Sequence, residues 1–467
     1  MIQKITNLFS SQDMTVGKPM TCLLRFSIPL LIGNLAQQLY STVDSIIVGQ
    51  YVGDRALSAI GTTLPIINLL LVLFIAISTG TSIMVAQYFG AKERDRLSHS
   101  VGNAITLILA SSVIIMAVGI PLSGSLLKLT NTPTETYDLA HTYLVIILAG
   151  VAFSGLYNIL SGVLRGLGNS VYPLFVLITA SILNIFLDIY FIANLHMGVG
   201  GAALATIISQ AVSAILCLLK LLRMKDTVDI NISMLIPDGD LVSQLMRLGL
   251  PSGITQVIFS MSMVFVQSLT NSMGYRVVTC TTAVMRIDGF AMMPNFTFGM
   301  AIATFVGQNI GANKLDRIEE GRRDILKISL TTSVILVSLL LLLGENLIRL
   351  FTSTEDIINL GVRQIRILAP GYVAMAVSQI FGGIMRGAGD TMPSMWISII
   401  TTVCIRVPLA YIWASMTRSP MYPAGSPDAL FFSLLISWVI GAILNYMWYR
   451  RGTWKEKSLI KYGVIAE

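Results

Sequence analysis

Long apolar runs alternate with short polar segments along this chain, which is the pattern of a protein that crosses a membrane many times. No charged residue occurs in the runs 56–91, 97–127 and 139–164, and similar runs follow to the end. Because roughly 20 apolar residues span the hydrocarbon of a bilayer, these runs predict twelve transmembrane helices. We place the helices at 22–50, 56–88, 98–124, 138–164, 171–193, 199–223, 243–271, 276–308, 320–346, 359–386, 391–415 and 428–450.

The composition supports this pattern. Charged residues make up 12% of the 467 positions and hydrophobic residues 54%, whereas a soluble domain carries roughly 25% charged residues. A soluble enzyme, a nucleic-acid binder and a disordered regulator are therefore excluded. The net charge of +7 does not indicate nucleic-acid binding here, and the distribution of Lys and Arg between the two sides of the membrane predicts the orientation. With a cytoplasmic N-terminus, 22 Lys and Arg fall inside and five outside, or seven if Arg363 and Arg366 are counted there. We expect a multi-pass protein of the plasma (inner) membrane with both termini in the cytoplasm.

Short motifs recur at a fixed distance along the chain. Gly90-Ala91 recurs as Gly311-Ala312, and Arg165-Gly166 recurs as Arg386-Gly387, both after 221 residues. Each half then holds six helices, so the second half enters the membrane from the same side as the first. The predicted fold is an all-α polytopic membrane protein with two six-helix lobes, related by a pseudo-two-fold axis along the membrane normal.

This repeat divides the chain into five parts. We expect a cytoplasmic N-terminus at 1–21, an N-terminal lobe at 22–223, a cytoplasmic linker at 224–242, a C-terminal lobe at 243–450 and a cytoplasmic tail at 451–467.

Catalytic machinery is not apparent in the sequence. No phosphate-binding Gly-x-x-x-x-Gly-Lys-Ser/Thr motif occurs, and the three histidines, His99, His141 and His196, form no cluster. The four cysteines lack metal-ligand spacing and are typical of small buried side chains. We therefore expect a secondary transporter rather than an enzyme, with no cofactor and no nucleic-acid partner.

Charged side chains inside the predicted spans are the main candidates for function, because they are costly in hydrocarbon. Asp44 in the first helix and Asp188 in the fifth lie at similar depth, since each is about 27–28 Å from the cytoplasmic end of its helix at 1.5 Å per residue. A polar residue lies one turn before each, on the same face. The candidate coupling-ion residues are Asp44, Asp188, Asn184, Tyr40, Asn158 and Thr206. The alternative is that each aspartate only bridges two helices.

The second half carries a different set of charges: Arg286 and Asp288 in the eighth helix and Arg406 in the eleventh. One interpretation is an arginine–aspartate pair that locks this lobe, and another is a role in substrate binding or ion relay. Met261 and Met293 belong to a methionine-rich stretch of the seventh and eighth helices, which is typical either of a promiscuous apolar cavity or of ordinary packing.

These features together resemble the multidrug and toxic compound extrusion (MATE) family. The resemblance rests on Pro29, Asp44 and Val48-Gly49 in the first helix, and on the Gly-Ala and Arg-Gly-x-Gly turns of both halves. It implies export of organic cations and drugs by alternating access, driven by inward H⁺ or Na⁺, and we expect a monomer in the lipid bilayer.

The acidic residues resemble the DinF-like and MepA-like branch, whose cation site lies in the N-terminal lobe. That resemblance implies an H⁺ or Na⁺ site at Asp44, Asp188 and Asn184. The NorM-like branch instead uses acidic residues of helices 7 and 10, and those helices have none in their interiors here. Asp288 leaves a second protonation site open.

Two other transporter classes remain as alternatives. A major-facilitator transporter also has twelve helices, but the loop around Asp95-Arg96 departs from the glycine spacing of that class. A lipid-linked precursor flippase of the wider superfamily would favour a strongly cationic cavity, for which Arg286 and Arg406 are the available charges.

Overall fold

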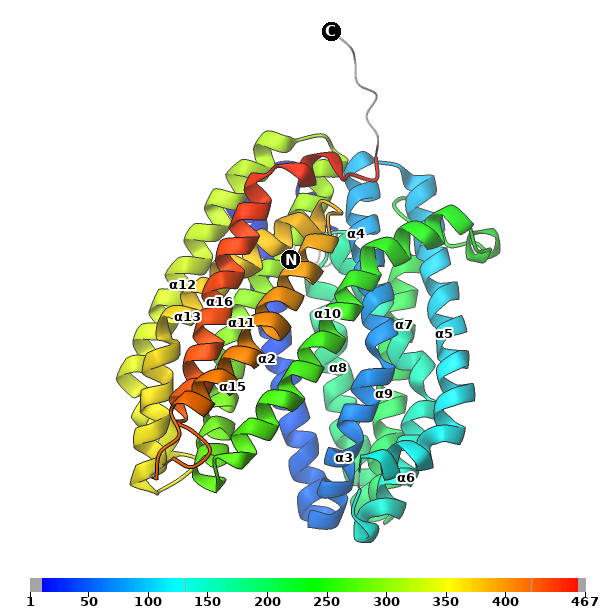
Figure 1. The fold of residues 1–467 in the computed structure, drawn as a ribbon. Coiled ribbons are helices and arrows are strands. Elements are labelled where there is room, and N and C mark those ends of the chain that lie inside the picture. Colours follow the sequence, from blue (N-terminus) through cyan, green and yellow to red (C-terminus); the bar gives the residue numbers. More distant parts are fainter. Residues whose placement is uncertain (1–10, 131, 421, 461–467) are drawn as a thin grey trace. The chain divides into compact units, whose positions relative to one another are not determined.

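The computed structural model describes residues 11–130, 132–420 and 422–460. The outer parts of the two predicted tails, 1–10 and 461–467, lie outside these residues. Helices dominate the described part, which has no strand beyond an isolated bridge between Ser419 and Tyr422 (Figure 1). The helices of the first half are α2 (Pro19–Tyr51), α3 (Asp54–Leu70), α4 (Val72–Ala91), α5 (Arg94–Leu129), α6 (Thr134–Ala149), α7 (Val151–Gly166), α8 (Val171–Asp188), η1 (Ile189–Asn194) and α9 (Gly198–Leu222). Those of the linker and the second half are η2 (Ile232–Leu235), α10 (Gly239–Ser272), α11 (Tyr275–Gly311), α12 (Leu315–Arg349), α13 (Glu355–Gly387), α14 (Met392–Ser398), η3 (Ile399–Arg406), α15 (Val407–Met416), α16 (Asp428–Arg450) and η4 (Thr453–Glu456).

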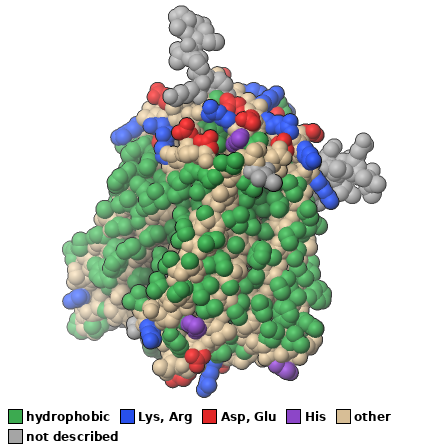
Figure 2. Space-filling view, turned by 90° about the vertical axis from the view of Figure 1, so that its right-hand side faces the viewer, with side chains coloured by type: hydrophobic (Ala, Val, Ile, Leu, Met, Phe, Trp, Pro, Cys, Tyr) green, Lys and Arg blue, Asp and Glu red, His purple; other side chains and the backbone are tan. Residues whose placement is uncertain are grey.

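Twelve predicted spans have counterparts in the described residues. Eleven helical segments are long and apolar enough to cross a membrane, and α6 with α7 forms a twelfth that is bent by 52°. Figure 2 shows a broad apolar band on one face, with charged side chains gathered at its two edges. The prediction of a polytopic all-α membrane protein is therefore confirmed.

Several spans are irregular in ways that a charge-free run does not reveal. The second span breaks at Leu71, between α3 and α4, and the fourth bends at Gly150, between α6 and α7. The fifth span ends in the π-helical turn η1, and the eleventh contains the π-helical segment η3. Such π-turns often occur at functional sites, and these two adjoin Asp188 and include Arg406.

The described chain forms two compact units. The N-terminal unit comprises Ile28–Gly253 with the described residues before Val16, and the C-terminal unit comprises Val16–Ser27 with the described residues from Ile254 onward. The division falls inside α2 and α10, close to Pro29 and Pro251. The start of the first span therefore belongs to the C-terminal unit, and the start of the seventh belongs to the N-terminal unit. The unit boundaries thus differ from the lobe boundaries expected at 22 and 243.

The internal repeat extends to the backbone conformation. Left-handed φ values occur at Gly53 (99°), Lys92 (60°) and Gly168 (79°). They recur 221 residues later at Gly274 (95°), Asn313 (55°) and Gly389 (90°). Gly90-Ala91 ends α4, whereas Gly311 ends α11 and Ala312 follows it. The residues after the two pairs, Lys92 and Asn313, adopt the left-handed conformation. The two halves therefore reverse direction with the same local geometry.

The Gly-x-x-Arg-Gly motifs allow close helix packing inside each unit. A Cβ at Gly166 in α7 would lie 2.9 Å from the carbonyl oxygen of Ser82 in α4. Its counterpart at Gly387 in α13 would lie 2.2 Å from that of Ala303 in α11. Both glycines therefore have a packing role, since any side chain would push the neighbouring backbone away.

The linker follows the N-terminal part of α5 within the N-terminal unit. Asp229 N donates to Ser98 Oγ (2.9 Å), and Asp238 N donates to Asn103 Oδ1 (2.7 Å). A Cβ at Gly102 would lie 2.1 Å from a linker carbonyl oxygen. These contacts hold the linker against α5.

Candidate functional site

Two carboxyl groups meet inside the N-terminal unit. Asp188, the last residue of α8, is fully buried, and Asp44 in α2 is half-buried. The two groups lie within hydrogen-bonding reach of each other. Each also has a buried Oδ1 atom without a hydrogen-bond partner among the described residues. Each of the two carboxyl groups therefore keeps one unsatisfied acceptor.

Asn184 joins the Asp188 carboxylate to the neighbouring helix. It is fully buried one turn before Asp188, as the i, i+4 spacing predicts. With its amide oriented to satisfy both neighbours, Asn184 donates to Asp188 Oδ2 (2.7 Å) and accepts from Thr206 N of α9 (3.2 Å). This bridge holds one oxygen of Asp188 and leaves the other free.

Two tyrosines complete the cluster. Tyr40, one turn before Asp44, contacts the side chain of Thr206, and both carboxylates act electrostatically on it. Tyr143 of α6 is 7% exposed and is similarly close to both carboxylates. Sequence reasoning missed Tyr143, because its only signal is a phenolic hydroxyl inside a charge-free run.

Asn158 does not join this cluster. Its side chain is exposed on α7, where Nδ2 donates to the carbonyl oxygen of Ser154 (2.8 Å) in the same helix. Its own carbonyl oxygen accepts from Ser78 of α4 (3.1 Å). The other five predicted coupling-ion residues, Asp44, Asp188, Asn184, Tyr40 and Thr206, are brought together.

This arrangement is suited to binding a small cation. Two ionised carboxylates in contact repel each other strongly at low dielectric, so a proton or a metal cation between them removes the repulsion. Carboxylate, amide and hydroxyl oxygens are hard ligands of the kind that such cations prefer. Among the described residues no group of three or more His, Cys, Asp or Glu could hold a metal ion, so a Na⁺ would rely on the two aspartates with neutral oxygens.

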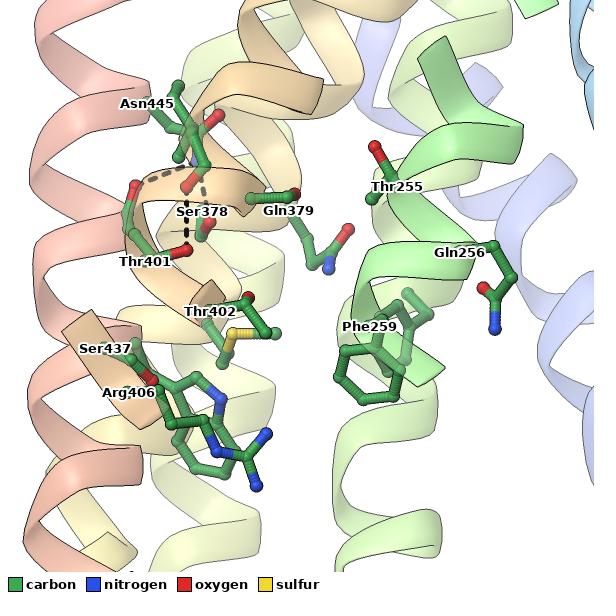
Figure 3. A pocket seen from close by; sticks show the side chains of 16 residues that line it. Thr255, Gln256, Phe259, Ser378, Gln379, Thr401, Thr402, Arg406, Ser437 and Asn445 are labelled. Carbon is green, nitrogen blue, oxygen red and sulfur yellow. Dashed lines mark hydrogen bonds between the residues drawn. The ribbon is translucent and has the colours of Figure 1, made fainter. Parts of the chain in front are cut away.

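The C-terminal unit contains a polar cavity of about 300 Å³. Figure 3 shows hydroxyl and amide side chains from α10, α13, η3 and α16 around it, together with Arg406. The labelled polar residues that line it are Thr255, Gln256, Ser378, Gln379, Thr401, Thr402, Arg406, Ser437 and Asn445. Arg406 therefore brings a formal positive charge into a wall of uncharged polar groups.

A second, more apolar cavity of about 290 Å³ shares part of this wall, including Phe259, Trp438 and Arg406. Asp288 lines the second cavity and accepts a hydrogen bond from the Tyr372 hydroxyl. Tyr372 is a further residue that the sequence analysis missed.

The predicted charge cluster of the second half does not form the expected ion pair. No ion pair within the described part of the chain includes Arg406 or Asp288. Arg286, two residues before Asp288, is exposed and lines neither cavity. The interpretation of an arginine–aspartate lock is therefore wrong, because Asp288 is held by a tyrosine instead.

The two methionines named from the sequence line no cavity described above, whereas others of the same methionine-rich stretch do. Met261 and Met293 line neither cavity, and Met261 is 55% exposed. The apolar cavity is instead lined by Met263, Met285, Met292 and Met375. A helix face cannot be assigned from a dense methionine stretch alone.

Fold and site together define a membrane transporter built from two homologous halves. The sequence model of the MatE family matches the chain twice, at residues 29–190 and 251–412. The chain therefore belongs to the MatE family of multidrug efflux transporters. The two matches are offset by 222 residues, in agreement with the internal repeat. The match also removes the major-facilitator alternative.

Named relatives are similar over nearly the whole chain. "Probable multidrug resistance protein YpnP" of Bacillus subtilis is 28% identical, over 96% of this chain and 98% of that protein. "Probable multidrug resistance protein NorM" of Thermotoga maritima is 26% identical, over 95% of both. "Multidrug export protein MepA" of Staphylococcus aureus is 22% identical, over 84% of this chain and 86% of that protein.

Solved structures agree with this assignment. A MOP superfamily transporter from Pyrococcus furiosus, described as having a binding pocket of reverse polarity, superposes with a TM-score of 0.87 at 26% identity, over 96% of this chain and 98% of that one. An outward-facing multidrug resistance MATE transporter gives the same TM-score and identity, over 96% and 99% of the chains.

Proposed function

We propose that this protein is a cation-coupled antiporter that exports organic cations and drugs by alternating access, in exchange for H⁺ or Na⁺. It acts as a single chain in the plasma membrane, with both termini in the cytoplasm, and needs no cofactor. The names of its relatives support drug export. The observation that carries ion coupling is the contact between the carboxyl groups of Asp44 and Asp188.

Competition for these carboxylates supplies the coupling. Organic cations are attracted while the site is negative, and a coupling ion that enters from outside neutralises it and lowers that attraction. The ion gradient drives the exchange even when no net charge moves, and each net unit charge that does move through 100 mV adds about 2.3 kcal/mol. The contact between the two groups favours one ion shared between them in each cycle.

Asn184 fits either state of this cycle. When Asp188 is ionised, the Asn184 amide nitrogen donates to it, as in the orientation above. When Asp188 carries a proton, a turn of the amide by half a rotation presents its oxygen as the acceptor. The same turn would offer an oxygen ligand to Na⁺, so the choice of ion is a matter for experiment.

Efflux of a cationic dye from loaded vesicles, with and without a gradient of H⁺ or Na⁺, tests this proposal. We expect gradient-dependent efflux in the wild type and its loss in Asp188→Asn, with the variant still present in the membrane. Arg96→Ala is the control, since Arg96 lies on an exposed surface, where it pairs with Glu93 at 3.6 Å. Efflux at the wild-type rate in Asp188→Asn would contradict the proposal.

The flippase alternative predicts a different outcome. A carrier of lipid-linked precursors would leave the cationic dye in the vesicle under every gradient. It would instead move a pyrophosphate-bearing lipid.

A further inference from the structure

Arg406 is a half-buried cation that lines both cavities and has no carboxylate partner among the described residues. Its Nε atom is shielded from solvent and has no hydrogen-bond partner within the described residues. Two exposed arginines at the ends of other spans do have carboxylate partners: Arg276 lies 2.7 Å from Asp356, and Arg349 lies 2.8 Å from Glu355. Because a buried polar atom without a partner is costly, the unpaired Nε of Arg406 at the cavity wall indicates a role other than stability.

The cavity around Arg406 offers donors to an anion. In Figure 3 the Arg406 guanidinium extends from η3 toward the space in front of Phe259, and the Gln379 amide points into the same space. The nearby hydroxyls of Thr401 and Ser437 already donate to carbonyl oxygens of their own helices, at 2.8 and 2.7 Å. The guanidinium and the Gln379 amide are thus among the donors that a ligand would meet, and a guanidinium fork matches a carboxylate in shape.

The adjoining apolar cavity can hold the rest of such a ligand. Aromatic and thioether side chains line it, among them Phe259, Met375 and Trp438. Asp288 faces it as well, held by the Tyr372 hydroxyl. The two cavities, of about 300 and 290 Å³, together accommodate a planar aromatic molecule of drug size.

We propose that the two cavities form a subsite for zwitterionic substrates, in which Arg406 binds the carboxylate and the basic end of the molecule lies toward Asp288. This inference rests on the proposed export function and specifies part of its substrate class. A purely cationic ligand gains nothing from Arg406, since the guanidinium repels it. The acidic group is the feature that this site recognises.

A matched pair of dyes isolates that group. Rhodamine 110 carries a free carboxylate, and rhodamine 123 is its methyl ester, so the two differ in one charge and one methyl group. Fluorescence anisotropy measures the binding of each to purified full-length protein in phosphatidylcholine nanodiscs. We expect Arg406→Gln to weaken rhodamine 110 by about ten-fold or more, as expected for the loss of a charge-assisted hydrogen bond. Rhodamine 123 should bind with unchanged or higher affinity, which also reports that the variant is folded.

Two further variants make the test specific. Arg406→Lys keeps the charge without the fork and should recover part of the rhodamine 110 affinity. Arg286→Gln removes the same charge from an exposed position outside both cavities and should leave both dyes unchanged. Equal changes for the two dyes in Arg406→Gln, or an equal loss of rhodamine 110 in Arg286→Gln, would overturn the inference.

Lipid headgroups present a similar acidic group, so the titration is repeated with phosphatidylglycerol in the nanodiscs. If the affinity for rhodamine 110 is unchanged, the result supports a site for soluble zwitterions. If phosphatidylglycerol competes with the dye and the competition depends on Arg406, the site binds anionic lipid, and the proposal of a substrate site is overturned. Equilibrium binding needs no ion gradient. Loss of gradient-driven efflux therefore contradicts the proposed function, and loss of the difference between the dyes contradicts this inference alone.

Discussion

At the Asp188 side chain, complete burial leaves few ways to satisfy a negative charge. One carboxylate oxygen accepts from Asn184 at 2.7 Å, and the other, Oδ1, has no hydrogen-bond partner among the described residues. A buried acceptor that stays unsatisfied is costly. The oxygen without a partner is therefore the one available to a cation, because the hydrogen bond from Asn184 already occupies the other oxygen.

Replacing Asn184 tests this division of roles. In Asn184→Leu the buried Asp188 oxygen loses its donor, which costs about 1–3 kcal/mol, or more for a charged group. We expect the coupling-ion concentration for half-maximal dye efflux to change by about ten-fold. Asn158→Leu is the matched control, since that amide is exposed and bonds only within its own helix. Equal responses of the two variants would show that Asn184 has no special part.

Much of this residue cluster could be predicted from the sequence. Intramembrane carboxylates stand out in a chain with 12% charged residues, and the i, i+4 spacing places Tyr40 and Asn184 on the faces of Asp44 and Asp188. Tyr143 could not be predicted, because an uncharged residue on another helix carries no signal of its direction. Polarity alone makes Asn158 a candidate, but its position on α7 leaves its side chain exposed and outside the cluster.

At the scale of helices, glycines determine how closely the spans approach each other. The spacing of Gly383 and Gly387 in α13 places both against α11, at 2.4 and 2.2 Å from carbonyl oxygens if a Cβ is added. Apolar burial drives little association inside a bilayer, so close packing of this kind is a main source of stability there. The same residues in the first half, Gly162 and Gly166, face α4 with more room.

A single methyl group should therefore disturb the C-terminal unit. Gly387→Ala would meet backbone atoms that cannot rotate away, and overpacking of this kind costs about 1–3 kcal/mol. We expect a lower thermal unfolding temperature for the purified variant, measured by intrinsic fluorescence. Gly61→Ala is the control, because nothing lies within 4 Å of its added Cβ, and helix propensity favours alanine there. An unchanged unfolding temperature for Gly387→Ala would contradict this packing role.

The positions of the spans could be predicted, but their irregularities could not. A charge-free run reports that a segment crosses the bilayer, and it says nothing of the bend at Gly150 or of the π-turns η1 and η3. These depend on packing against other helices. The repeat was visible in sequence because turns need the same residue types twice, as at Gly168 and Gly389.

At the scale of the whole molecule, the charge moved in each cycle follows from the number of ions that the site holds. If Asp44 and Asp188 share one H⁺ or Na⁺, its exchange for a monovalent organic cation moves no net charge. A membrane potential alone should then fail to drive uptake of a monovalent cationic dye into inside-out vesicles, whereas a pH or Na⁺ gradient should drive it. Dye accumulation under a potential alone would indicate that more than one ion is used.

The central claim is that the coupling ion and the exported cation compete for the same pair of carboxylates. Binding of a monovalent cationic dye to the purified protein, measured over a range of pH and of Na⁺ concentration, tests it most directly. We predict that dye affinity falls as the coupling ion rises, and that Asp44→Asn removes this dependence. An affinity indifferent to both pH and Na⁺ in the wild type would contradict the claim and leave the two aspartates as structural residues.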